Sequence, residues 1–290
     1  METALMNIFY KPLMIIIGII ISLVGVLIVY FNLSYSPLKS TFNRDLKSLI
    51  EKSPIENGLI SNDDFEKYPT AIKNFVKNSG FIGKSKMSYM NIFFENADFI
   101  QDVKKPKLKI DYNQYNFAKN PSRIAFIDSS LHGIPFEGYD GFINAEGRMT
   151  GIIAKNITLF NEKGLEMDKA SLCTYLAEAL FIPTSLLENN IVFEEIDLYN
   201  IRATINYNGN SASGIFTFND KFEMIQFYTK DRAIVKSDGS IEHIPWTARC
   251  SQYKIYENGI KLPTILEAVW NYPENDLVYF KGTIKNFEYR

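Results

Sequence analysis

The chain of 290 residues carries 31 basic and 33 acidic side chains, and its net charge of −2 argues against a nucleic-acid-binding protein, which normally shows a basic excess. Apolar residues make up 46% of the chain and charged residues 22%, which is the composition of a folded protein rather than a disordered one. Two cysteines exclude a disulfide scaffold and a four-cysteine zinc site, and two histidines argue against a histidine-based metal centre, so we expect no metal and no cofactor.

The first predicted element is an uncharged apolar run from Leu13 to Phe31. As a helix at 1.5 Å per residue it spans roughly 28 Å, close to the hydrocarbon thickness of a bilayer, and aromatic residues flank both of its ends. A cleaved signal peptide is the alternative, but the run is longer than a signal core and no small-x-small cleavage site follows it. We therefore predict a tail over residues 1–12 and a single uncleaved transmembrane helix over residues 13–31.

Basic residues give mixed evidence on the orientation of this helix. Lys11 precedes the run, whereas Lys39, Arg44 and Lys47 follow it, and a literal count favours a cytoplasmic body. A short tail with a basic residue beside the apolar run is, however, the usual form of an exported signal anchor. We expect a single-pass membrane protein whose body lies on the extracytoplasmic side.

Residues 37–83 are predicted as a helical connector. Apolar residues at helical spacing predict one helix over residues 40–52 and a second over residues 69–78. We interpret both apolar stripes as packing faces rather than binding sites, which is the usual meaning of an amphipathic helix.

From about residue 84 the pattern changes to short β-branched and aromatic runs. The clearest alternation predicts a three-stranded meander over residues 199–229, and further strands are expected near residues 249–257, 264–271 and 277–288. The dipeptides that we interpret as turns are Asp140-Gly141, Glu146-Gly147, Lys163-Gly164, Asn208-Gly209, Asp238-Gly239 and Asn258-Gly259.

One helical segment interrupts the strands, over residues 168–181, and either Asp168 or Ser171 can cap it. One more helical turn is expected at residues 184–187. Roughly ten strands with one or two helices predict a mainly β (α+β) fold, in which a large curved antiparallel sheet or half-open barrel carries one covering helix on its concave face. Because no linker divides residues 84–290, we expect a single antiparallel β domain there.

Familiar catalytic signatures are missing, but several residue types remain candidates for chemistry. Cys173 and Cys250 either pair in an exported body or remain two buried thiols. The 22 phenylalanines and 17 tyrosines either fill a core or line an apolar cavity of a partly closed sheet. Acidic residues cluster at Glu178, Glu194, Glu195 and Asp197. These carboxylates either serve acid/base chemistry as a pair or form the solvated face of a strand. A third interpretation is a carboxylate at the mouth of a cavity, paired with Arg202 or Arg232.

The run Tyr175-Leu176-Ala177-Glu178-x-x-Phe181-x-Pro183-Thr184-x-Leu186-Leu187 resembles a motif of an uncharacterised group of bacterial domains. Further motifs of that group lie in the same order, namely Tyr68-Pro69-Thr70-Ala71-Ile72, Glu195-x-Asp197, Phe216-x-Phe218-Asn219, Asp231-Arg232, Pro245-Trp246, Gly259-x-Lys261-x-Pro263-Thr264 and Trp270. The likeness covers about residues 65–290, and the group has no established activity. In architecture only, the predicted sheet and helix look like the open-barrel carriers of lipoproteins and lipids in bacterial envelopes.

Three functions stay open. The preferred hypothesis is a membrane-anchored, non-enzymatic domain that binds a lipid or other apolar ligand in a half-open barrel. The alternatives are an envelope interaction or structural module with a filled core, and a hydrolase that uses Glu178 and Asp197. The candidate ligand-binding residues are Tyr175, Glu178, Phe181, Asp197, Arg232, Trp246 and Trp270. Expected partners are the membrane and the apolar ligand, with no nucleic acid and no assigned protein partner.

Overall fold

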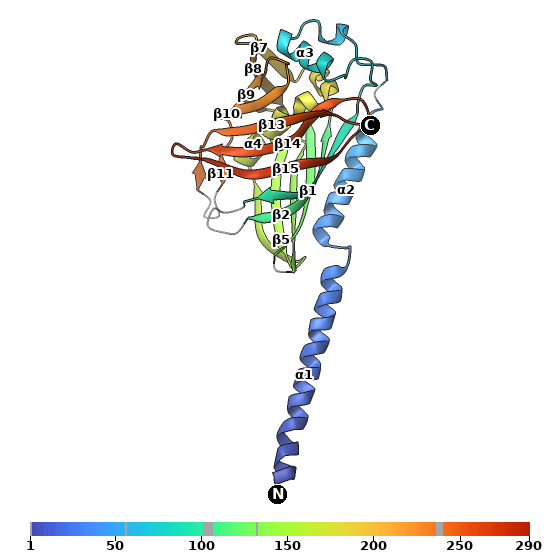
Figure 1. Ribbon diagram of the computed structural model, residues 1–290, viewed down its shortest axis with the longest axis vertical. Coiled ribbons are helices and arrows are strands. Elements are labelled where there is room, and N and C mark those ends of the chain that lie inside the picture. Colours follow the sequence, from blue (N-terminus) through green and yellow to red (C-terminus); the bar gives the residue numbers. More distant parts are fainter. Residues whose placement is uncertain (1, 56, 101–106, 132, 236–239) are drawn as a thin grey trace.

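The computed structural model describes residues 2–55, 57–100, 107–131, 133–235 and 240–290 (Figure 1). It begins with α1 (Glu2–Asn32), a single long helix that projects away from the body. The apolar side chains from Leu13 to Val29 are largely exposed along this helix, which is long and apolar enough to cross a membrane.

Three shorter helical elements lie between α1 and the sheet in the described part of the chain. The first, α2 (Pro37–Lys52), begins three residues before the predicted start, because proline suits the first helical turn and the Ser36 side chain caps the helix by accepting from the backbone N–H of Lys39. Leu38 and Phe42 of α2 pack against the outer face of the sheet, where a small second core forms. The short helix η1 (Asp63–Phe65) and α3 (Thr70–Asn78) follow, and α3 matches the predicted second helix to within one residue.

Over the described residues, the body is one open antiparallel sheet of thirteen strands, more than the roughly ten that we expected, with β6 and β7 at its two edges. Its order is β6-β5-β4-β3-β2-β1-β15-β14-β13-β10-β9-β8-β7, and β11 pairs separately with β12. The strands are β1 (Tyr89–Phe99), β2 (Leu108–Phe117), β3 (Ser122–Leu131), β4 (Ile134–Ile143), β5 (Glu146–Ile153), β6 (Ile157–Lys163), β7 (Ile191–Glu195), β8 (Asn200–Tyr207), β9 (Asn210–Phe218), β10 (Met224–Thr229), β11 (Ile234–Val235), β12 (Ile241–Glu242), β13 (Trp246–Ile255), β14 (Lys261–Asn271) and β15 (Asp276–Tyr289).

The sheet curves strongly around α4 (Leu165–Glu178), as expected for a covering helix on the concave face. This helix contacts both β5 and β9, which lie far apart in the strand order, so the sheet must bend to bring them to one helix. Strand β5 runs along the direction of α1 and α2, whereas β13, β14 and β15 cross that direction (Figure 1). Glycines at Gly214 and Gly282 leave room for the rings of Phe227 and Phe94 against the backbone, which suits such curvature.

The helical segment differs from its prediction at its start. It begins at Leu165 after Gly164, and neither Asp168 nor Ser171 caps it. The Asp168 carboxylate instead accepts from the backbone N–H of Gly147 at 2.6 Å, which ties α4 to β5. The helix ends at Glu178 and continues as η2 (Ala179–Phe181) and η3 (Pro183–Glu188), so the extra turn expected at residues 184–187 is confirmed.

Two of the predicted turns are wrong. Asp140-Gly141 lies inside β4, where the Tyr139 ring leaves no space for a Cβ on Gly141, and Glu146-Gly147 opens β5. The true turn between these strands is formed by Asn144 and Ala145, both with positive φ. The Asp238-Gly239 turn lies outside the described residues.

Candidate functional site

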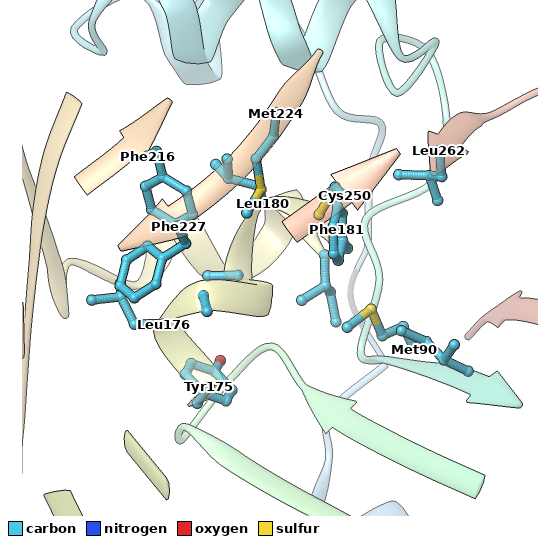
Figure 2. Close-up of a cluster of buried hydrophobic side chains, with 14 of the residues drawn as sticks. Met90, Tyr175, Leu176, Leu180, Phe181, Phe216, Met224, Phe227, Cys250 and Leu262 are labelled. Atoms are coloured by element: carbon cyan, nitrogen blue, oxygen red, sulfur yellow. The ribbon is translucent and has the colours of Figure 1, made fainter. Parts of the chain in front are cut away.

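One end of the concave face is a packed core. Tyr175 and Phe181, two of the predicted ligand-binding residues, are 1% and 2% exposed there. The Tyr175 hydroxyl donates to the backbone oxygen of Phe117 at 2.8 Å, and the backbone oxygen of Phe181 accepts from the hydroxyl of Tyr289 at 2.6 Å. Figure 2 shows both side chains within a cluster of buried apolar groups. At this end they hold α4 and η2 against the sheet.

Glu178, at the end of α4, lies in a buried polar network on β2 and β3. Its Oε2 atom accepts from Gln114 Nε2 at 2.8 Å, from Asn116 Nδ2 at 2.7 Å and from Arg123 Nε at 2.9 Å. The three donors come from inward positions of adjacent strands, and all three residues are less than 5% exposed. One carboxylate oxygen thus satisfies three buried donors at once.

Arg123 connects Glu178 to a second carboxylate. Its Nη1 donates to Asp140 Oδ2 at 2.6 Å and its Nη2 to the hydroxyl of Tyr112 at 2.6 Å. Burial alone would lower the pKa of Arg123, but the charge of Glu178 and the other groups around it raises this pKa well above its usual value. Burial also raises the pKa of Tyr112, so this phenol stays protonated. The guanidinium is therefore permanently charged and held by two carboxylates.

Sequence reasoning found Glu178 but missed its partners. A signal existed: Arg123 alternates with Ala125 and Ile127 on the inward face of β3, and Gln114 and Asn116 share a face of β2 at the same spacing. Polar residues at positions that period-two alternation places in a core mark a buried network or a site.

A second cluster brings together three of the predicted residues. Trp246 and Trp270 lie directly opposite each other on β13 and β14. The Arg232 guanidinium carbon is 4.5 Å from the centre of the Trp246 ring and 5.5 Å from that of Trp270, within the range of cation–π attraction. Trp246 Nε1 donates to the hydroxyl of Tyr279 at 3.0 Å, and the rings of Trp270 and Tyr279 stack at 5.7 Å. Within the described part of the chain, the buried Nε atom of Arg232 has no hydrogen-bond partner.

Beside this cluster the concave face is only partly covered. Five side chains pack against the main core and yet remain partly exposed, namely Leu266, Ala268, Trp270, Tyr279 and Phe280. We call this set the aromatic wall. It differs from the α4 end, where large side chains such as Phe216 and Phe227 are fully buried. A mostly apolar surface with one cation beside it has the composition of a small-molecule site.

Asp197 lies apart from both clusters. Its carboxylate accepts from the backbone N–H groups of Tyr199 and Asn200 at 2.8 and 2.9 Å, and these bonds lower its pKa. The other members of the acidic cluster also have separate partners: Glu194 pairs with Arg202 at 3.7 Å, and Glu195 faces the first turn of α3. The structure therefore does not bring the predicted carboxylates together.

The two thiols are free and buried. Burial raises the pKa of Cys173 to about 11, and its sulfur lies 3.8 Å from the hydroxyl of Thr229. Among the described residues, no group of histidine, cysteine and acidic side chains is arranged to hold a metal ion. A polar groove of about 350 Å³ lies elsewhere, between α2 and β4–β5, and it includes Tyr139, Arg148 and Asp168 but none of the predicted site residues.

Comparison with known proteins gives a family and two distant structures. A family model described as a family of unknown function (DUF6544) matches residues 58–282. No curated protein matches the chain. A domain from Vibrio parahaemolyticus, described as that of an outer membrane lipoprotein-sorting protein, is 9% identical with a TM-score of 0.36, over 70% of this chain and 84% of that one. A DUF1329 family protein from Desulfovibrio piger is 9% identical with a TM-score of 0.41, over 76% of this chain and 91% of that one. These two similarities are too low to support an inference about function.

Proposed function

We propose a function for this chain, which belongs to a family of unknown function (DUF6544). The proposal is based on the arrangement of side chains on its own sheet. The protein is a membrane-anchored, non-enzymatic domain that binds a lipid or other apolar ligand at the aromatic wall. α1 anchors it in a bacterial membrane, and the body, including the sheet of residues 84–290, lies on the extracytoplasmic side.

The observation that carries this proposal is the contrast between the two ends of the concave face. At the α4 end Tyr175 and Phe181 are buried, whereas Trp270, Tyr279 and Phe280 remain partly exposed. Leaving large aromatic side chains partly in water forgoes stabilisation of about 25 cal/mol per Å². An apolar ligand that covers them would recover it, and Arg232 beside them supplies one polar contact.

A second function is favoured by a different observation. The dense packing of Tyr175 and Phe181 suits an interaction or structural module whose core is filled and whose partners bind its surface. This alternative predicts that no apolar ligand enters at the aromatic wall. The hydrolase hypothesis needs Glu178 and Asp197 at one site, and their separate sets of partners give it no support.

The chain provides its own reporter for a test. Of its only two tryptophans, Trp270 belongs to the aromatic wall and Trp246 lies directly opposite it on β13, and α1 contains none. We would titrate the full-length protein in detergent with a fatty acid brominated on its acyl chain and follow tryptophan fluorescence. The proposal predicts saturable quenching with one ligand per chain.

A filling substitution provides the matched comparison. Ala268→Leu adds bulk at the wall, whereas Ile265→Leu changes a residue that alternation places on the outer face of the same strand. Ala268→Leu should weaken quenching at least tenfold and Ile265→Leu should not, with both variants melting as cooperatively as the wild type. Quenching that never saturates, or that is equal in both variants, would reject ligand binding at this wall and favour the filled-core module.

A further inference from the structure

The β5–β6 turn is fixed to the end of the long apolar helix. Ala154 and Lys155 both have positive φ within a three-residue turn, residues 154–156, that joins β5 to β6 without glycine. The buried Lys155 ammonium donates to the backbone oxygens of Leu33 and, at 3.3 Å, of Tyr35, and it lies 5.9 Å from the centre of the Tyr30 ring. These contacts satisfy a buried cation and hold the turn in one place.

A second set of contacts joins the same region to the body. The Asn156 side chain donates to the hydroxyl of Tyr30, and the Ser36 hydroxyl donates to the buried carboxylate of Glu137 on β4. α1, α2 and the sheet are thus connected by side chains as well as by the chain itself. The lower tip of β5 lies beside the break between α1 and α2 (Figure 1).

These contacts fix the depth of the turn relative to a membrane. The apolar run of α1 ends at Phe31, and tyrosine at such an end lies at the headgroup level of a bilayer. Because Lys155 and Asn156 contact Tyr30 and Leu33, the β5–β6 turn lies at that level too. The start of β4 lies beside it, since the backbone N–H of Ala154 donates to the oxygen of Pro135 at 2.8 Å.

Exposed apolar side chains surround this junction. On the edge strand β6, Ile157 is 60% exposed and Leu159 is 50% exposed. With these two, the set that we call the rim patch comprises Leu33, Tyr35, Ile134, Ile157 and Leu159, all of them exposed. Leu33 and Tyr35 of the patch follow directly after α1, whose apolar side chains are also exposed.

We infer that the rim patch lies within the headgroup–acyl boundary of the bilayer that α1 crosses, so that the body rests on the membrane instead of standing clear of it. This inference rests on the proposed membrane anchor. The occupant is lipid, because the patch lies at the end of a helix that the proposed anchor places in a bilayer, and aliphatic and tyrosine side chains suit that boundary. An edge strand held in lipid is also protected from pairing with another chain.

Spin labels on the full-length protein test this placement. We would label three variants that each add one cysteine to the two native ones, in vesicles of phosphatidylethanolamine and phosphatidylglycerol. They are Ile157→Cys on β6, Val192→Cys on the opposite edge strand β7 and Val24→Cys within α1. Ile157 and Val192 are matched, since both are β-branched, on an edge strand and about 60% exposed. The native thiols are buried, and unsubstituted protein measures their background labelling.

The readout is the collision rate of each label with oxygen, which concentrates in lipid, and with a water-soluble nickel chelate. We expect the labels at positions 157 and 24 to favour oxygen and the label at position 192 to favour the chelate, each by several-fold. An aqueous label at position 157 with a lipid-exposed label at position 24 overturns the rim placement and leaves the anchor intact. An aqueous label at position 24 overturns the anchor and the rim placement together. Equal oxygen preference at positions 157 and 192 also overturns the inference, because the body would then contact lipid without orientation.

Discussion

Glu178→Gln tests whether the buried network is a structural element or a reactive site. Glu178 provides the Oε2 atom that accepts from Gln114, Asn116 and Arg123 within 2.9 Å, and its side chain is 14% exposed. The substitution keeps the shape of the side chain and removes its charge. Arg123, whose side chain is also almost completely buried, would lose one of its two carboxylate partners.

The expected loss of stability follows from that geometry. Removing one partner of a buried ion pair costs about 3–5 kcal/mol, because the remaining charge is left uncompensated. Arg123 retains Asp140 at 2.6 Å and glutamine still offers an acceptor oxygen, so we expect the lower end of this range, about 3 kcal/mol. At 2–4 °C per kcal/mol, this corresponds to a decrease in Tm of about 6–12 °C.

The assay is thermal unfolding of the full-length protein in detergent, followed by circular dichroism. Glu194→Gln is the control, because Glu194 is 74% exposed and its pair with Arg202 should contribute little. If Glu178→Gln melted within 2 °C of the wild type, the structural account of the network would be refuted. That outcome would instead favour a reactive carboxylate, since catalytic residues are often dispensable for stability or even unfavourable to it.

Three further predictions concern packing, thiol reactivity and pH. Gly147→Ala should lower Tm by several degrees, because the new methyl would lie 2.3 Å from a backbone oxygen of α4. Gly18→Ala is the control, since its methyl would have open space around it and should leave Tm unchanged. Equal changes in Tm would contradict the packing of α4 against β5. Cys173 and Cys250 should react with a thiol reagent only on unfolding, since both are buried, and fast labelling of native protein would show that α4 opens readily. Burial alone would raise the pKa of Asp231, but hydrogen bonds from a lysine and a serine hold this pKa below its ordinary value of 3.8. The stabilisation that ionised Asp231 contributes is therefore present above pH 3.8 and lost as pH falls through the folded pKa. The difference in urea midpoint between wild type and Asp231→Asn should shrink on acidification. A difference that grows would show that the pKa of Asp231 is raised by folding.

Local patterns in the sequence were enough to predict the elements. Period-two alternation located the meander over residues 199–229 because its strands have one buried face, and Asn208-Gly209 has the positive φ values that a tight turn requires. The helices after Ser36 and Gly164 begin about three residues before their predicted starts, since capping depends on contacts as well as on composition. Asp140-Gly141 misled because a glycine that makes room for a ring has the same signature as a glycine in a turn.

The candidate site was only partly predictable. Arg232, Trp246 and Trp270 were chosen separately and meet in the structure, but Asp197 stabilises its own turn and Phe181 belongs to the core. Arg123 lies 55 positions from Glu178, and no local pattern pairs residues across such a distance.

The sequence by itself determined the long apolar helix, the succession of antiparallel strands and the single helix among them, because each depends on hydrophobic periodicity within a few residues. Only the tertiary structure decided which part of the concave face α4 fills, where the aromatic wall stays open, and how Lys155 fastens the sheet to the end of α1. Those features depend on sheet curvature and on strand order, which set contacts between residues far apart in the chain. The near-neutral balance of charges likewise gave no sign that one arginine, Arg123, lies buried between two carboxylates.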